Sequence, residues 1–322
     1  MNKVHPIAGV DRALTFSEKE NRCQSTFNNC IRRGDSFFHL CTPGNNQQII
    51  FSTKEEYEAG MLIFAVALYE SPDVRIITYE LMSNHLHSIA LGTLAAIEEF
   101  FSRLKNRLRK YLNRVSRVSS LNQFIPNIIQ IDSLESLRNQ IAYTNRNNYL
   151  VNPNETPFSY PYGANGYFFN PFAKQQLTRR YGDLTIREKK ELLHSHNLSY
   201  PDNYRVFGNY FTPDSFCEIA LGEAMFRDAR HYFHKITRDI ESYREVAAML
   251  GDLIYYTDDE LISVLYGICK KEYDGQKPTL LAAQDKLAVA KRLHYDYNAD
   301  NAKIVRLLRI DSRILENLFP CK

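Results

Sequence analysis

The feature that most constrains the fold is the alternation of residue patterns between positions 36 and 147. Short runs rich in β-branched and aromatic residues, typical of strands, are separated by longer segments with apolar residues at helical spacing. The strand-like runs are 36–41, 74–81, 85–91 and 125–131, and the helical segments are 53–70, 93–114 and 132–147. This order predicts an α+β domain, a ferredoxin-like antiparallel sheet with helices packed on one face.

The rest of the chain is predicted to form three further regions. Residues 1–35 are polar and irregular, and residues 173–255 are expected to be a mainly helical linker after the α+β domain, which spans residues 36–172. Residues 256–322 are predicted to be short helices, including 285–293, 301–308 and 312–319, with Asp311 or Ser312 as a cap.

The last two of these helices are joined by a tight turn at Arg309-Ile310-Asp311 and resemble a helix-turn-helix module. A plain helical bundle is the alternative. A small core is expected from Ile304, Val305, Leu308, Ile310, Ile314, Leu315 and Leu318. The candidate DNA contacts in this module are Arg306, Arg309 and Arg313.

Bulk composition excludes several classes of protein. The net charge is only +3, so any nucleic-acid partner must be argued from how the charges are distributed. The six cysteines contain no C-x-x-C pair, which disfavours a disulfide framework or a zinc ribbon. The N-terminus lacks the apolar core of a signal peptide, and no apolar run is long enough for a membrane span. A cytoplasmic protein is expected.

His85 and His87 flank Leu86 in a run predicted to form a strand. Side chains alternate along a strand, so both imidazoles would point to one side while Leu86 enters the opposite layer. Two adjacent imidazoles suit two coordination positions on one metal ion. Two unrelated histidines on a solvated face are the alternative.

Tyr143 and Asn147 lie four residues apart on a predicted helix and therefore share a face. Ile141, in the apolar stripe of that helix, lies roughly 200° away at about 100° per residue, so Tyr143 can project toward a site. Beside a divalent cation a phenol becomes a competent nucleophile toward a phosphodiester, and the Asn147 carboxamide oxygen would be a third metal ligand. A tyrosine that only packs its ring is the alternative.

A run of positive charge covers residues 103–117, where seven cations occur in fifteen residues with no acid among them. Such a run suits a phosphate backbone, and a solvated helix face is the alternative. The cations are Arg103, Lys105, Arg107, Arg109, Lys110, Arg114 and Arg117.

These pieces together resemble the REP-associated tyrosine transposases of the HUH superfamily, which also contains the small single-tyrosine transposases of insertion sequences. Residues 78–87 (TYELMSNHLH) are similar to the family's Y-x-L-M-P-N-H-x-H, with Ser83 in place of the usual Pro. Residues 141–147 (IAYTNRN) correspond to its tyrosine helix. The resemblance spans about residues 36–170 and includes 44–47, 50–51, Tyr57, the basic helix over 104–114 and 157–160 (PFSY).

The resemblance implies that Tyr143 is the nucleophile and that His85, His87 and Asn147 hold Mg²⁺ or Mn²⁺. It implies a transposase that cleaves and rejoins single-stranded or hairpin DNA through a 5′-phosphotyrosine, as a monomer or a homodimer. The alternatives are a DNA-binding protein of the same fold without catalysis, an unrelated metal hydrolase and a structural adaptor. The residues after His87 (SIALGTLA) offer no further His or Asp ligand, which disfavours the hydrolase.

Overall fold

The structure, a computed structural model, describes most of the chain. The described residues are 14–31, 34–43, 49–151, 158–173, 177–238, 246–247, 249–250, 258–297 and 299–319, without the side chains of 147–151, 238, 258–260 and 263.

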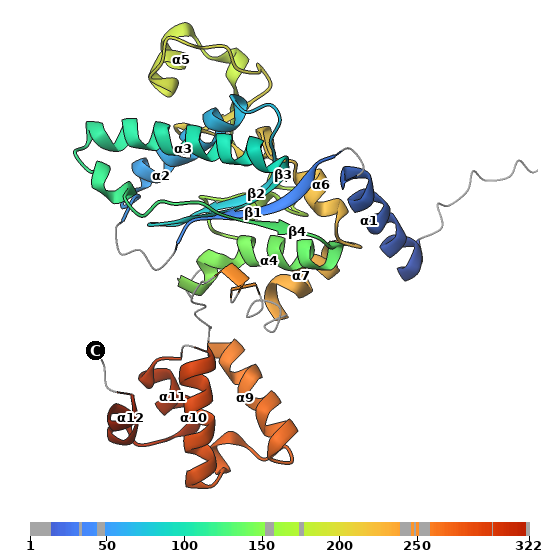
Figure 1. Ribbon diagram of the computed structural model, residues 1–322, viewed down its shortest axis with the longest axis vertical. Helices are drawn as coiled ribbons and strands as arrows, with labels where there is room; N and C mark the ends of the chain where they lie inside the picture. Colours follow the sequence, from blue (N-terminus) through green and yellow to red (C-terminus); the bar gives the residue numbers. More distant parts are fainter. Residues whose placement is uncertain are drawn as a thin grey trace, which may run out of the picture.

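A four-stranded antiparallel sheet forms the centre of the fold, which is of the α+β class (Figure 1). The strands lie in the order β2-β3-β1-β4. Their bounds agree with the predicted runs to within two residues and are Ser36–Cys41 for β1, Arg75–Leu81 for β2, Leu86–Gly92 for β3 and Asn127–Ile131 for β4.

Helices cover both faces of this sheet, so the prediction that they pack on one face is wrong. In Figure 1, α2 (Lys54–Tyr69) and α3 (Leu94–Arg114) lie above the sheet, and α4 (Leu134–Val151) and α7 (Ala229–Arg238) lie below it. The reason lies in β3, which is buried at every position and therefore exposes neither face to water.

The helices on the upper face begin where the sequence predicts. The Thr53 side chain accepts a hydrogen bond from the backbone N–H of Glu56, and Thr93 caps α3 in the same way through Ala96. Each cap satisfies a backbone donor that the first turn would leave without a partner. Phe64 of α2 then stacks on Tyr79 of β2, with ring centroids 4.3 Å apart, and fixes the helix to the sheet.

The N-terminal segment, predicted to be irregular, contains a helix in its described part, because Phe16–Ile31 form α1. The segment was misjudged because its apolar stripe is only three residues, Cys23, Phe27 and Cys30, which are spaced at helical intervals and buried. Thr15 and Glu18 supply a reciprocal cap at its start.

In the described part of residues 173–255, which are predicted to be mainly helical, helices do not predominate. These residues contain a second, three-stranded sheet, which is too short for residue periodicity to reveal it. The elements of this region are β5 (Arg179–Arg180), α5 (Ile186–Leu193), β6 (Arg205–Phe207), β7 (Tyr210–Phe211), α6 (Ile219–Ala224) and α7. Aromatic rings, among them Tyr181, Tyr200 and Phe211, pack together beneath them.

The C-terminal residues form a separate group of helices, drawn at the bottom of Figure 1. The sequence predicts α11 and α12 well, and the Asp311 side chain accepts from the Arg313 N–H as a cap. Ile314 was expected in the core but is exposed by 45%. The helices are α9 (Asp258–Glu272), α10 (Ala283–Tyr297), α11 (Asn301–Leu308) and α12 (Ser312–Leu318).

Short 3₁₀ helices complete the connections. They are η1 (Val118–Leu121), η2 (Asn165–Tyr167), η4 (Tyr181–Asp183), η5 (Pro213–Ser215) and η6 (Pro278–Leu280). Among the residues described, no helix combines the length and the apolar character required to cross a membrane.

Arg138 of α4 ties three parts of the lower layer together. Its guanidinium donates to the Met225 carbonyl at 2.6 Å and to the Glu20 carboxylate of α1 at 2.7 and 3.2 Å, and its side chain is only 2% exposed. Arg138→Met is therefore expected to lower the free energy of unfolding by about 2 kcal/mol, as for charged hydrogen bonds generally. Chemical denaturation measures this, and Arg22→Met on the exposed side of α1 should change little.

Candidate metal and nucleophile site

Polar side chains form a row across the sheet on the face that α4 covers. Cys41 of β1 pairs in register with His87 of β3 and with Asn127 of β4, and His87 pairs in turn with Glu80 of β2. Residues in register share a face of the sheet, so this row of side chains points the same way. The sheet thereby presents hydrogen-bonding and metal-binding groups to α4, where an apolar face would be expected.

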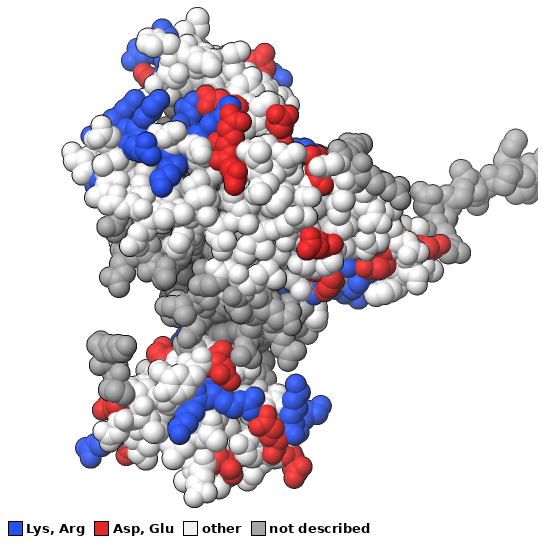
Figure 2. Space-filling model, viewed as in Figure 1, with Lys and Arg blue, Asp and Glu red and all other residues white. Residues whose placement is uncertain are grey.

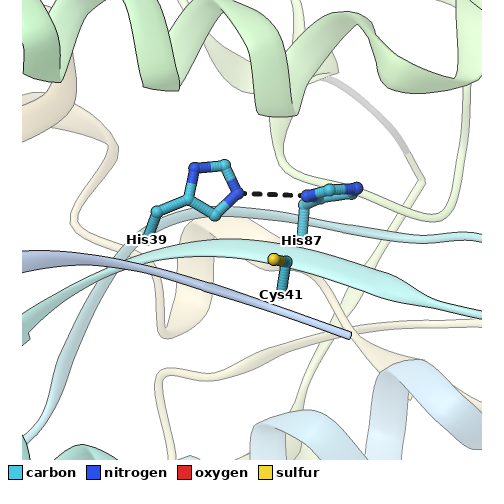
Figure 3. Close-up of side chains that lie close together, drawn as sticks. All are labelled: His39, Cys41 and His87. Atoms are coloured by element: carbon cyan, nitrogen blue, oxygen red, sulfur yellow. Dashed lines mark hydrogen bonds between the residues drawn. The ribbon is translucent and has the colours of Figure 1, made fainter. Parts of the chain in front are cut away.

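His39, two residues before Cys41, lies on the same face and links this row to α4. Its Nε2 lies 3.0 Å from His87 Nδ1, and its Nδ1 lies 2.9 Å from Gln140 Oε1. Figure 3 shows the two imidazole rings rising from neighbouring strands toward a helix, joined by the dashed hydrogen bond, with Cys41 below them. All three residues that carry this chain of contacts, His39, His87 and Gln140, have no exposed surface.

His39, Cys41 and His87 could together hold a metal ion, because their ligand atoms all lie within 4.8 Å of one another. The sequence prediction included only His87 of this group. A usable signal was present, since His39-Leu40-Cys41 has the same one-residue spacing as His85-Leu86-His87. Imidazole and thiolate are the ligands that zinc prefers.

His85 lies just before β3 and beside His87, with the two rings 5.1 Å apart between centroids. The two histidines are therefore neighbours, as the strand pattern predicts. A neighbouring segment of backbone fixes the turn that carries His85, since the N–H groups of Ile50 and Phe51 donate to the Ser83 carbonyl at 2.7 and 2.9 Å. His85 Nδ1 also lies 2.7 Å from the Asn84 side-chain oxygen.

Desolvation keeps this histidine cluster neutral. Burial lowers the pKa of His39 to about 4 and the pKa of His85 to about 4. Burial, and then the neighbouring His85 and His39 rings, hold the pKa of His87 well below its usual value. Neutral imidazoles are the metal-binding form, so these rings need not lose a proton to bind a cation at neutral pH.

The depressed pKa of His39 predicts an acid-sensitive fold when chelator keeps metal away. Between pH 6.5 and about 4 the unfolded chain binds a proton on His39 that the folded chain does not. Stability should therefore fall as pH is lowered through this window, by about 3 kcal/mol at about 1.4 kcal/mol per pKa unit.

Urea unfolding in EDTA at several pH values measures this effect. His39→Gln should make the profile shallower, while His85 and His87 keep part of the slope. A wild-type stability that stays constant from pH 6.5 to 4 would contradict the prediction.

The Tyr143 ring of α4 faces the histidines, whereas the helical spacing alone predicts only that this ring lies off the apolar stripe. Its ring centroid lies 5.5 Å from that of His87 and 6.2 Å from that of His39. The side chain is only 2% exposed, because α7 covers the other side of α4 and the sheet covers this one. The Asn147 backbone follows one turn later in α4, but its predicted role as a ligand concerns a side chain outside the described residues.

The predicted basic run lies on α3, on the face of the sheet opposite to Tyr143 (Figure 1). Acids outside the run partly balance its charges. Arg103 pairs with Glu99, one turn earlier in α3, whereas Arg107 pairs with Glu70 and Arg117 with Glu56, which the local sequence does not show. Lys105 donates to the Phe124 carbonyl at 2.6 Å.

The remaining cations of α3 form a free basic patch: Arg109, Lys110 and Arg114 are exposed and pair with no acid that the structure describes. Figure 2 shows the blue cluster over this end of α3, beside a red group. A groove separates the patch from α5 and is lined by Lys110, Arg114 and His194 together with apolar and acidic residues. The groove is therefore remote from the histidine cluster.

The three C-terminal arginines of the sequence prediction lie close together along the chain, in and around the connection between α11 and α12. Arg306, Arg309 and Arg313 are all exposed around the α11–α12 turn. Arg309 is the turn residue itself and adopts a left-handed conformation, with φ of 51°. The three side chains therefore border one short connection.

Comparison with known proteins identifies no relative: no protein-family model, no curated protein and no solved structure matches this chain.

Proposed function

We propose that this chain is a metal-dependent DNA strand transferase of the single-tyrosine HUH type, a transposase-like enzyme. The observation that carries the proposal is the position of the Tyr143 ring, 5.5 Å from the ring of His87 and on the same side of the sheet. His87 and Tyr143, which are 56 residues apart in the sequence, thus belong to one cluster in space. A phenol beside two adjacent imidazoles suits phosphodiester transesterification.

The fold supports the proposal at a coarser level. The central sheet is antiparallel, its strands are in the order β2-β3-β1-β4, and α2 and α3 connect them. We propose that this β-α-β-β-α-β chain is a ferredoxin-like domain and that it serves as the HUH nuclease scaffold.

The donors suit a divalent cation. His85 and His87 place two nitrogen ligands side by side, and Asn147 would add an oxygen. A bound Mg²⁺ or Mn²⁺ would polarise the scissile phosphate. His85 and His87 would orient that phosphate through the cation that they hold, and Tyr143 would provide the nucleophile.

In the proposed reaction the Tyr143 oxygen attacks phosphorus and loses its proton as the new P–O bond forms. The bond from phosphorus to the 3′ oxygen breaks, and that oxygen takes up a proton and leaves as a 3′-hydroxyl. The product is a 5′-phosphotyrosine. The 3′-hydroxyl of a second strand reverses these changes and rejoins DNA, so the sequence of steps consumes no external energy source.

The experiment is incubation with Mn²⁺ or Mg²⁺ and end-labelled single-stranded hairpin DNA from the flanks of the gene, followed by a denaturing gel. Label that migrates with the protein, and a phosphonucleotide mapped to the Tyr143 peptide by mass spectrometry, would support the proposal. An adduct mapped to another tyrosine would remove Tyr143 from its role.

The second candidate is a DNA-binding protein on the same fold without catalysis. It is favoured by the burial of Tyr143, whose side chain is only 2% exposed and gives a phosphate little direct access. Tight binding of the hairpins, with no adduct in either metal, would support this second function.

Both candidates assign DNA contacts to the C-terminal arginines. Changing all three to Gln should weaken binding and flatten the dependence of log K on log salt by up to about 3, since each phosphate contact contributes about 0.9. Fluorescence anisotropy at several salt concentrations measures the slope. The control replaces three exposed cations of the same helical group, Lys270, Lys271 and Lys277, and should change the slope less.

A further inference from the structure

The side chains behind His87 form a directional chain of hydrogen bonds that begins on α4. The Gln140 amide nitrogen donates to Ser136 Oγ at 3.0 Å, one turn earlier in the helix. With the amide in this orientation, the Gln140 carbonyl oxygen points at His39 Nδ1, 2.9 Å away. A carbonyl oxygen only accepts, so His39 Nδ1 must carry a hydrogen.

The same donor and acceptor argument applies to His39 and then to His87. Both rings are fully buried, which disfavours a charged imidazole, so each carries one proton. With its hydrogen on Nδ1, His39 presents a lone pair at Nε2. His87 Nδ1, 3.0 Å away, must then donate, so the remaining lone pair of His87 is on Nε2.

A different hydrogen bond gives His85 the same tautomer. Its Nδ1 lies 2.7 Å from the Asn84 side-chain oxygen, which accepts, so His85 also has its lone pair on Nε2. The two neighbouring imidazoles therefore present the same nitrogen, although one is oriented by a local turn and the other by a helix across the sheet.

We infer that His39 and Gln140 are positioning residues that hold His87 as its Nδ1–H tautomer, so that Nε2 of His87 binds the divalent cation. This inference rests on the proposed metal-dependent function and adds to it two residues outside the ligand set. It also makes His39 a hydrogen-bond acceptor for a ligand rather than a ligand itself. Outer groups of this kind fix the orientation and basicity of metal-binding histidines.

The tautomers are tested directly by long-range ¹H–¹⁵N correlation spectra of the full chain, labelled in its nine histidines and kept in EDTA. Single His→Gln variants assign the signals. The expected result is an Nδ1–H form for both His39 and His87. An Nε2–H form of His87 in the metal-free wild type overturns the inference.

Metal affinity gives a second readout, with Mn²⁺ alone as the probe in titration calorimetry. Gln140→Met removes the acceptor, frees His39 to change tautomer and should lower affinity about 10- to 100-fold, the usual cost of losing an outer-shell partner. Gln140→Glu keeps an acceptor oxygen and should restore affinity. Unchanged Mn²⁺ affinity in Gln140→Met overturns the inference, as does a loss in His39→Ala as complete as in His87→Ala.

Ile89→Val is the matched control, because Ile89 lies opposite His39 in register, is fully buried and takes no part in the chain. It should lower thermal stability without changing the tautomers or Mn²⁺ affinity. These measurements use no DNA. If the strand-transferase proposal is wrong, the wild-type protein will form no covalent adduct with DNA, whatever the tautomer of His87. The two proposals can therefore fail separately.

Discussion

Tyr143→Phe abolishes the covalent protein–DNA adduct, on the proposed mechanism, while leaving hairpin binding near the wild-type level. The substitution removes the only atom that attacks phosphorus and keeps the ring that packs against His87 and His39. One hydroxyl contributes on the order of 1 kcal/mol to stability, so the variant should remain folded. A denaturing gel with labelled DNA measures the adduct, and anisotropy measures the binding.

The control is a Tyr→Phe substitution at another buried position on the α4 side of the sheet. Tyr232 of α7 is fully buried, and its hydroxyl donates to Asn165 and accepts from Asn145. Tyr232→Phe should therefore destabilise the fold at least as much and yet keep the adduct. An adduct that persists in Tyr143→Phe would exclude Tyr143 as the nucleophile.

The second large effect is expected for His87→Ala. His87 belongs both to the proposed His85–His87 pair and to the His39–Cys41–His87 group, so its loss should remove metal binding in either arrangement. The loss of Mn²⁺ affinity should exceed the roughly 10- to 100-fold cost of changing an outer-shell partner. Adduct formation should fall with it, while thermal unfolding in EDTA reports whether the variant is folded.

Two further variants separate the arrangements. If the cation lies between His85 and His87, His85→Ala should abolish Mn²⁺ binding and Cys41→Ser should leave it unchanged. If the buried thiol is a ligand, the reverse holds, and Co²⁺-loaded protein should show thiolate-to-metal charge transfer that Cys41→Ser removes. That second outcome would indicate a structural site and would contradict the proposed catalytic one.

The central domain is well predicted from the sequence because its local signals agree. Thr53 and Thr93 both act as caps, and all four strands carry β-branched or aromatic runs. Regular patterns of this length survive in any tertiary context, since propensity and burial act in the same direction. The strands around α5 could not be predicted, because strands of two or three residues show no measurable periodicity.

The candidate site is predictable only in part. Spacing along a strand places His85 beside His87, because that relation is local. The position of Tyr143 against them depends on how α4 packs on the sheet, which spacing along the helix does not show. His39 and Gln140 are 101 residues apart, and only the register of β1 against β3 and the docking of α4 bring them together. The acids that neutralise part of α3 were missed for the same reason, since Glu70 and Glu56 come from α2 and its end.

The central sheet separates the buried tyrosine from the free basic patch on α3. A single strand of DNA that reached both would have to bend round an edge of the sheet, whose outer strands are three spacings apart, about 14 Å. An oligonucleotide trimmed to the scissile phosphate would then keep the reaction centre and lose its electrostatic anchor. Substrate length, more than base sequence, would thus decide how tightly the protein holds its DNA.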